Sequence, residues 1–299
     1  MKSILLLINR HSRTGESAIK SVLEQLEKSN HHIIKLTDDE RDIDPNKLIE
    51  KYKDRTDCVV IGGGDGSVNR ALPALVKTQI PLIVIPLGTA NNLARTYELT
   101  ANIEEVRFLL DHGITISVDL GRVNGIYFVN VAGLGVSTQV NHQVPSWFKR
   151  YFGVFAFIVT AFQVLRKARP FKATITADGK AIQSLSWQIS VCNGKHYGSG
   201  LTIKDTASLV DNMLHCLSTE ITNWWTSVFL IPAFFKGKYS RTDDVTLVAG
   251  TKITITTKRA IKIDVDGDVQ TTTPAEFEVI PRILKLVIRP DVHARDQTA

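Results

Sequence analysis

The chain has 299 residues, 43% of them hydrophobic and 22% charged; this is an ordinary globular composition, and the length predicts about two domains. The net charge of +6 is either a mild excess of lysine and arginine, or it suits an anionic substrate or an anionic membrane surface. The sequence has no long basic run and no basic-aromatic repeat, so we do not expect a nucleic-acid partner.

The first half of the chain alternates between two kinds of segment. Short apolar or β-branched stretches predict strands at "SILLLIN", "HIIKL", "CVVI" and "PLIVIPLG". Apolar residues at helical spacing predict helices at "SAIKSVLEQLEKS", "DPNKLIEKYKD", "SVNRALPALVK" and "ANIEEVRFLLDHG". Pro45 lies near the start of the second helix, and Gly113 ends the fourth. Strict alternation of strand and helix predicts a parallel sheet covered by helices.

The pattern changes after about Ile114. Two β-rich segments flank Val123-Asn124-Gly125, where Asn-Gly is a strong hairpin signal. One helical region is expected from about Ser146 to Lys167, and the rest alternates apolar and polar residues between turn signals. We therefore predict an α/β N-terminal domain with a parallel sheet, followed by an antiparallel β-sandwich domain. The expected domains are 1–125, with the tail 287–299 packing back on it, and 126–286.

The cysteines and the apolar runs indicate the cellular compartment of the protein. Cys58, Cys192 and Cys216 form no C-x-x-C pair, and each lies in or beside an apolar run, so we expect buried free thiols in a reducing cytosol. The N-terminal "MKSILLLINRHS" has only five apolar residues in a row, too few for a signal peptide. The longest apolar run, Tyr151 to Phe162, falls short of the about 20 residues that a membrane span needs. These features predict a cytoplasmic protein.

The stretch "DCVVIGGGDGSVNRAL", Asp57 to Leu72, carries a glycine-rich loop from a strand into a helix. It is not a Walker A loop, because no lysine follows Gly66, and it does not fit the G-x-G-x-x-G fingerprint of dinucleotide sites. Backbone N–H groups at a strand-to-helix turn can nevertheless bind an anion. The alternative is a tight structural turn with Asp65 as a cap.

Two further loops favour the binding site. "IPLGTANNLAR", Ile85 to Arg95, and "INRHSRTG", Ile8 to Gly15, also lead out of predicted strands. Loops that follow neighbouring parallel strands lie on the same carboxyl edge of the sheet, where ligands bind in open α/β folds.

"GGGDGSVN" and "PLGTANNLAR" resemble the paired signatures of the diacylglycerol kinase catalytic domain family. This family includes bacterial soluble lipid kinases and sphingosine kinases and is related to NAD kinases. The resemblance continues through "NVAGLG", "NGKHYGSG", "ASLVDNML" and "VDGD" and covers nearly the whole chain. It implies an ATP- and Mg²⁺-dependent lipid kinase that acts in phospholipid metabolism.

The resemblance also implies which residues contact the nucleotide. Asp65 is expected to face Mg²⁺, directly or through water, or a ribose or substrate hydroxyl, because a carboxylate beside phosphates is otherwise repelled. The full implied set is Asn9, Thr37, Gly62, Gly63, Gly64, Asp65, Gly66, Ser67, Asn69, Gly88 and Thr89.

A second group of carboxylates lies in "KIDVDGDVQ", which holds Asp264, Asp266 and Asp268. Alternation predicts that all three lie on one face of a strand; the alternative is a polar face that ends in an Asp-Gly turn. In the family this place carries D-G-E, whose acids serve as or support the catalytic base. Here D-G-D replaces it, which leaves open whether Asp266 or Asp268 is the base.

A structural Mg²⁺ is implied at "ASLVDNML". The matching ligands are Asp211 and the carbonyl groups of Ser208 and Met213, and oxygen ligands suit a hard cation. The alternative is a plain Asp-Asn turn.

The chain departs from the family pattern at Arg70, at Arg10 after Asn9, and at Ser137. Arg70 bears on Mg²⁺ or substrate preference, and Ser137, in place of an aspartate, argues against sphingosine-like amine substrates.

The segment "SWFKRYFGVFAFIVTAFQVLRKARPF" is apolar in the middle and basic at both ends. It is either a core helix or a helix that lines a lipid site or touches an anionic bilayer. Its flanking basic residues are Lys149, Arg150, Arg166, Lys167 and Arg169.

The function that we predict is ATP-dependent phosphorylation of a lipid hydroxyl, diacylglycerol-like or phosphatidylglycerol-like, by a peripherally membrane-associated enzyme. One alternative is a kinase for a non-lipid hydroxyl compound. The other is a catalytically weak nucleotide- or lipid-binding protein, with Arg70 and D-G-D as signs of decay. The sequence leaves a homodimer open.

Overall fold

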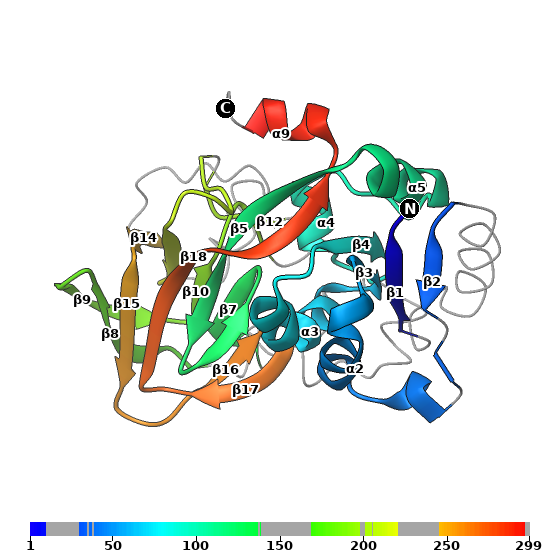
Figure 1. Cartoon of the computed structure of the whole chain (residues 1–299). Coiled ribbons are helices and arrows are strands. Elements are labelled where there is room, and N and C mark those ends of the chain that lie inside the picture. The colour runs from blue at the N-terminus through cyan, green and yellow to red at the C-terminus, as the bar shows by residue number, and fades with distance from the viewer. Residues whose placement is uncertain are drawn as a thin grey trace. The chain divides into compact units, whose positions relative to one another are not determined.

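The structure of the chain is a computed structural model (Figure 1). It describes residues 1–9, 30–34, 36–37, 39–136, 138, 169–197, 201–204, 206–220 and 245–296. The helices expected at 17–29 and 146–167 lie outside these residues. Among the described residues, no helix has the length and the apolar character that crossing a bilayer requires.

The chain divides into two compact units. Unit 1 comprises Met1–Leu120 and Pro281–Ala299, and unit 2 comprises Gly121–Ile280. The divisions lie a few residues before the expected domain boundaries. Unit 1 is α/β with a parallel sheet and unit 2 is built from antiparallel strands, so the predicted fold class is confirmed.

Unit 1 is organised around a parallel sheet in the order β2-β1-β3-β4, and the last part of β18 pairs beside β4. The pairs β1–β2, β1–β3 and β3–β4 are all parallel. The strands are β1 (Ser3–Ile8), β2 (His32–Ile34), β3 (Cys58–Gly63) and β4 (Leu82–Pro86). The aliphatic side chains of β3 and β4 and those of Ile4, Leu5 and Leu6 in β1 are buried, as expected for a parallel sheet that is covered on both faces, whereas Leu7 and Ile8 are partly exposed.

The helices predicted at 44–54, 67–77 and 101–113 are present in unit 1, whereas the helix at 290–296 was not predicted. Asp44 caps α2 by accepting a hydrogen bond from the N–H of Asn46 (2.8 Å), and Pro45 occupies the first turn. The helices are α2 (Pro45–Tyr52), α3 (Asp65–Thr78), α4 (Asn92–Thr96), α5 (Ile103–His112) and α9 (Pro290–Asp296), with short 3₁₀ helices η1 (Asp39–Asp42) and η2 (Lys53–Arg55).

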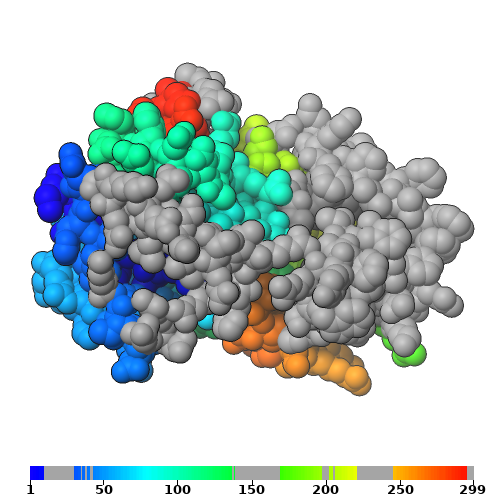
Figure 2. Space-filling view, turned by 90° about the vertical axis from the view of Figure 1, so that its right-hand side faces the viewer, coloured from blue at the N-terminus to red at the C-terminus, as the bar shows by residue number. Residues whose placement is uncertain are grey.

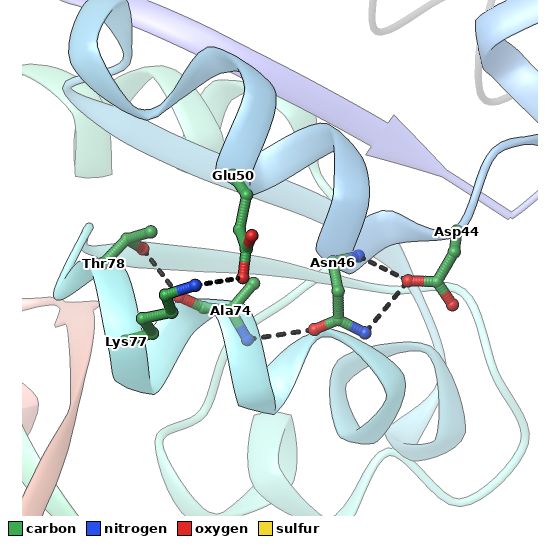
Figure 3. A network of polar contacts seen from close by, with 6 residues as sticks. All are labelled: Asp44, Asn46, Glu50, Ala74, Lys77 and Thr78. Carbon is green, nitrogen blue, oxygen red and sulfur yellow. Dashed lines mark hydrogen bonds and ion pairs between the residues drawn. The ribbon is translucent and has the colours of Figure 1, made fainter.

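Helix α3 contains Pro73, which has no N–H to donate and whose ring crowds the preceding turn. Figure 3 shows how α2 supports the next turn of α3: the side chain of Asn46 accepts from the N–H of Ala74 at 2.9 Å. The same amide donates to the carbonyl of Arg70 at 2.6 Å. These are the two groups that an uninterrupted helix would pair with each other. Asn46 therefore fixes α3, the helix that follows the glycine loop, at its proline.

Unit 2 contains two larger antiparallel sheets. One has the order β14-β13-β10-β7-β16-β17, and the other contains β18-β15-β8-β9 with β5 and β6 attached. A short pair, β11 with β12, completes it. The strands that lie wholly or partly in unit 2 are β5 (Ile114–Val123), β6 (Ile126–Phe128), β7 (Val131–Gly135), β8 (Phe171–Ala177), β9 (Lys180–Ser186), β10 (Gln188–Cys192), β11 (His196–Tyr197), β12 (Leu201–Thr202), β13 (Leu214–Thr219), β14 (Val245–Gly250), β15 (Lys252–Thr257), β16 (Lys262–Val265), β17 (Asp268–Thr272) and β18 (Ala275–Ile288), of which β5 and β18 extend into unit 1.

A single apolar cluster joins side chains from both larger sheets of unit 2. Phe128 and Phe277 pack edge to face at its centre, with ring centroids 6.5 Å apart. The predicted turn at Asn124-Gly125 is confirmed, with φ of 47° and 85°. Cys58, Cys192 and Cys216 are buried free thiols as predicted, and burial raises the pKa of Cys58 and of Cys216 to about 12.

Replacing Asn46 with alanine should destabilise unit 1 by about 1–2 kcal/mol, because the Arg70 carbonyl and the Ala74 N–H then lose their partner. Urea unfolding followed by circular dichroism measures the change. Lys47→Ala, an exposed neighbour on α2, is the control and should stay within about 0.5 kcal/mol. Equal midpoints for both variants would show that the bridge does not stabilise α3.

Candidate functional site

The ends of β1, β3 and β4 lie together at the carboxyl edge of the sheet in unit 1, as the sequence predicts, and the first loop lies outside the described residues beyond Asn9. The N–H of Asn9, at the end of β1, donates to the carbonyl of Gly62 at 2.8 Å. The N–H of Leu87, at the end of β4, donates to the carbonyl of Gly63 at 3.0 Å. Parallel pairing thus continues past the strands and holds the loops together.

The glycine loop and the second loop touch through their backbones. A Cβ atom on Gly88 would overlap the Cα of Gly64, and a Cβ atom on Gly64 would lie 3.1 Å from the Cα of Gly88. Asn91, at φ 50°, holds Gly88 from both sides: it accepts from the Gly88 N–H (3.0 Å) and donates to the Gly88 carbonyl (2.9 Å). Glycine is needed here because the two chains approach more closely than side chains allow.

Asp65 joins the same two loops. Its carboxylate accepts from the N–H of Asn92 at 3.0 Å and from the N–H of Leu93 at 3.3 Å. The cap of its own helix is Gly64, so the side chain of Asp65 caps the start of α4 instead. The structure therefore gives this carboxylate a role in positioning the loops, while its expected contact with Mg²⁺ or a hydroxyl stays a prediction.

Several groups at this edge are open to a ligand. Gly88 and Thr89 are exposed, and no side chain caps the first turn of α3. The Oδ1 atom of Asn92 is buried without a hydrogen-bond partner among the described residues. An acceptor oxygen without a partner suits a hydroxyl donor or a cation, and helix N–H groups suit a phosphate. The residues present therefore fit a nucleotide with its Mg²⁺.

Ser67 and Asn69 of the implied set lie on the first turns of α3. The hydroxyl of Ser67 accepts from the Asn9 side chain at 3.2 Å, and it covers Gly63, where a Cβ atom would overlap it. Asn69 is buried within unit 1. Ser67 therefore packs the glycine loop against the end of β1.

Thr37 lies in the loop after β2 and is exposed. Its N–H donates to the buried carboxylate of Glu40 at 2.9 Å, which also accepts from Lys51 Nζ (2.5 Å) and from the Tyr52 hydroxyl (2.6 Å). Lys51 first, and then Tyr52 and the Thr37 N–H, lower the pKa of Glu40 to about 2. This network, which the sequence did not reveal, fixes the loop that carries Thr37.

The carboxylates of "KIDVDGDVQ" do not lie on one strand, so that expectation is wrong. Asp264 is on β16, Asp268 begins β17, and Asp266-Gly267 form the turn between them. Both turn residues have positive φ, 48° and 107°, which is the geometry of a two-residue type I′ hairpin. The Asp-Gly turn was the alternative reading of the stretch.

The two candidate bases differ in their surroundings. The Asp266 carboxylate accepts from the N–H groups of Val129 (2.7 Å), Asn130 (3.0 Å) and Val131 (3.0 Å). Asp268 is exposed, and no hydrogen bond or ion pair is recorded for it in the described part of the chain. Asp266 thus holds the turn before β7, whereas Asp268 has its carboxylate open to a substrate.

Asp211 closes a turn through hydrogen bonds. It accepts from the N–H of Ser208 (3.1 Å) and of Met213 (2.9 Å), and His215 Nε2 lies 3.0 Å from its Oδ2. Residues 206–220 and the rest of the described chain contain no cluster of three or more metal-ligating side chains. These contacts close the Asp-Asn turn, and the structural Mg²⁺ implied at Asp211 and the carbonyl groups of Ser208 and Met213 stays a prediction.

Some of the residues that the sequence analysis singles out lie outside the described part of the chain. Arg10, Ser137 and the basic residues from Lys149 to Lys167 lie outside the described residues. Arg70 is exposed on α3. Sequence reasoning missed the roles of Glu40, Asn46, Asn91 and Asn92; only the Asn pair carries a local signal, because asparagine tolerates positive φ after a glycine turn.

Gly88→Ala should abolish ATP binding, because the added Cβ atom would overlap the backbone of Gly64. Gly64→Ala should weaken ATP binding less, because its Cβ atom would only crowd the backbone of Gly88. Calorimetric titration with ATP measures both, and far-UV circular dichroism checks that each variant is folded. Wild-type affinity in Gly88→Ala would contradict the loop assignment.

Glu40→Gln should lower stability at neutral pH, and the difference from wild type should vanish in acid. The folded-state pKa of Glu40 is depressed from 4.5 to about 2, so its stabilisation is present above about 4.5 and is lost as the pH falls through about 2. Urea midpoints across this range measure the effect. The control is Glu50→Gln, which breaks only an exposed ion pair with Lys77 and should change stability little at any pH. A Glu40→Gln difference that is independent of pH would contradict the network.

Two family models together match nearly the whole chain. The diacylglycerol kinase catalytic domain matches residues 3–123, and the YegS C-terminal NAD kinase beta sandwich-like domain matches residues 130–288.

Individual relatives agree with the models. A diacylglycerol kinase of Mycobacterium tuberculosis is 31% identical over 247 residues, 79% of this chain and 77% of its own. A diacylglycerol kinase of Bacillus subtilis is 25% identical over 235 residues, 78% of each chain. The crystal structure of a diacylglycerol kinase from Bacillus anthracis, 22% identical, covers 97% of this chain and 98% of its own with a TM-score of 0.72, which shows a shared fold. The chain therefore belongs to the diacylglycerol kinase family, as the paired glycine-loop signatures predict.

Proposed function

We propose that the protein transfers the γ-phosphoryl group of ATP to the hydroxyl of a lipid, diacylglycerol-like or phosphatidylglycerol-like. The observation that carries this proposal is the backbone contact between Gly64 and Gly88, which builds a side-chain-free cradle from the two loops of the family signature. Relatives named as diacylglycerol kinases support a lipid as the acceptor.

The nucleotide is bound by unit 1. The first-turn N–H groups of α3 and the exposed Thr89 face the phosphates, and the Oδ1 of Asn92 takes a hydroxyl or the cation. Mg²⁺ bound with ATP supplies charge neutralisation at the β- and γ-phosphates. Asp65 acts on this site by holding Asn92 and Leu93, the first residues of α4.

Unit 2 supplies the base. Of the two acids that match the family's D-G-E, Asp268 has its carboxylate open, whereas Asp266 is committed to three backbone N–H groups. Asp268 therefore accepts the proton of the lipid hydroxyl, and Asp266 positions it by fixing the hairpin turn. Because Asp268 stands where the family has glutamate, the side chain of the proposed base is one methylene shorter.

The proposal is tested by ATP consumption with a panel of acceptors: diacylglycerol, phosphatidylglycerol, monoacylglycerol, sphingosine and a water-soluble polyol. Turnover with a glycerolipid and none with the polyol is the expected result. Turnover with the polyol alone would favour the non-lipid kinase. ATP binding without turnover on any acceptor would favour the catalytically weak binding protein.

In the same assay, Asp268→Asn should lower kcat by about 10²-fold, the low end for a general base, because a loose transition state needs less help from a base. Its ATP affinity and thermal midpoint should match wild type. Asp266→Asn should instead lower the free energy of unfolding by about 2–3 kcal/mol, since it loses charge-assisted hydrogen bonds while asparagine keeps the positive φ. If Asp266→Asn lowers kcat and Asp268→Asn lowers the free energy of unfolding, the roles of the two residues are exchanged.

A further inference from the structure

One end of unit 2 is formed by three segments that are distant in sequence. Residues 169–172 comprise the start of β8 and the two residues before it, residues 258–261 connect β15 to β16, and residues 271–274 comprise the end of β17 and its connection to β18. The N–H of Ile261 donates to the hydroxyl of Thr273 at 2.9 Å, and the N–H of Thr273 donates to the carbonyl of Ile261 at 2.9 Å. The orange ribbon near residue 260 lies at the bottom of Figure 1, and the orange atoms of this region lie at the bottom of Figure 2.

This end is strongly basic. Its cations are Arg169, Lys172, Lys258, Arg259 and Lys262, all of them exposed. The stretches 169–173, 256–263 and 271–275 contain no aspartate or glutamate. In the described part of the chain, no ion pair is recorded for any of the five cations. We call this surface the basic end.

Two of the cations lie side by side. Thr257 pairs with Ala173 in the antiparallel β8–β15 ladder, Lys258 follows Thr257, and Lys172 precedes Ala173. Extending this register places Lys172 opposite Lys258, and like charges in that position are destabilising. An anionic partner removes this cost, so the arrangement favours binding of negative charge.

Apolar side chains are interleaved with the charges. Phe171 and Ile261 are partly exposed and pack with their buried portions against the core of unit 2. Basic residues beside anchored apolar side chains suit the headgroup region of a bilayer. A nucleic acid fits less well, because the described residues of this end include no second aromatic ring on which bases could stack.

The basic end also lies close to the proposed base along one hairpin. Lys262 begins β16, and Asp268 pairs with Val265 at the other end of that strand. Three residues of strand span about 10 Å. A bilayer held at the basic end would therefore lie within about a lipid headgroup's reach of Asp268.

We propose that the basic end docks the protein on the surface of a bilayer that contains anionic phospholipid. The proposal rests on the proposed lipid kinase function, since it explains how the enzyme meets an insoluble acceptor. It assigns docking to the loops around β8, β15 and β16.

The test is vesicle sedimentation without ATP, using phosphatidylcholine vesicles with and without phosphatidylglycerol. The variant Lys258→Gln/Arg259→Gln should bind the anionic vesicles about 30-fold more weakly, because each basic residue near an anionic surface contributes about five-fold. The control Lys180→Gln/Lys252→Gln removes the same charge from the other end of this sheet, at the start of β9 and of β15, and should bind like wild type. Added salt should weaken wild-type binding.

Equal losses in both variants, or equal binding to neutral and anionic vesicles, would overturn the proposal. So would tighter binding to an RNA oligonucleotide than to anionic vesicles.

A short-chain diacylglycerol that is soluble as a monomer separates docking from catalysis. The Lys258→Gln/Arg259→Gln variant should keep wild-type turnover on this acceptor and lose turnover on vesicles. If wild type binds anionic vesicles through the basic end but phosphorylates no lipid, docking stands and the proposed function fails. If the variant matches wild type on vesicles, docking fails and the proposed function stands.

Discussion

The nucleotide side of the protein depends on one close approach, that of the backbones at Gly64 and Gly88. No side chain fits between them, so the two loops present backbone N–H groups and small polar side chains at the sheet edge. The parallel register of β1, β3 and β4 brings the loops there, and Asp65, Asn91 and Ser67 then lock them. The phosphate site that we propose here would be built from backbone geometry, which explains glycines and no lysine in the loops.

Three aspartates that the sequence singles out hold backbone N–H groups. Asp65 accepts from two N–H groups of α4, Asp266 from three N–H groups before β7, and Asp211 from two within its turn. A carboxylate satisfies several N–H donors at once, which makes it an effective clamp for irregular loops. Asp268 differs in being exposed. An acidic sequence motif can therefore contain both structural residues and candidate catalytic residues. The hydrogen-bond partners of each carboxylate show which residues are structural.

The basic end and Asp268 lie at opposite ends of the same short hairpin. A hairpin with a two-residue turn is a stiff connection, so a surface held at one end sets the position of the carboxylate at the other. The basic end places five of the chain's cations together, whereas composition alone left open whether the net charge serves a substrate, a membrane or neither.

The sequence by itself determined the fold class and the edge at which the loops meet. Alternating apolar segments predict the parallel sheet, and glycines after β3 and β4 mark the loops, because both signals are local. The sequence also contains the hairpin signal Asp266-Gly267. The alternation of apolar and polar residues continues across this turn, and it therefore suggested a single strand. The tertiary structure decided the contacts between residues that are distant in sequence. Asp65 caps α4, and Asp266 accepts hydrogen bonds from backbone N–H groups while Asp268 is exposed. Glu40 fixes the loop of Thr37, and Asn46 binds the backbone of α3 on both sides of Pro73. Each of these joins residues that lie apart in sequence or on different elements, and the partner of a polar side chain is fixed only when the chain has folded.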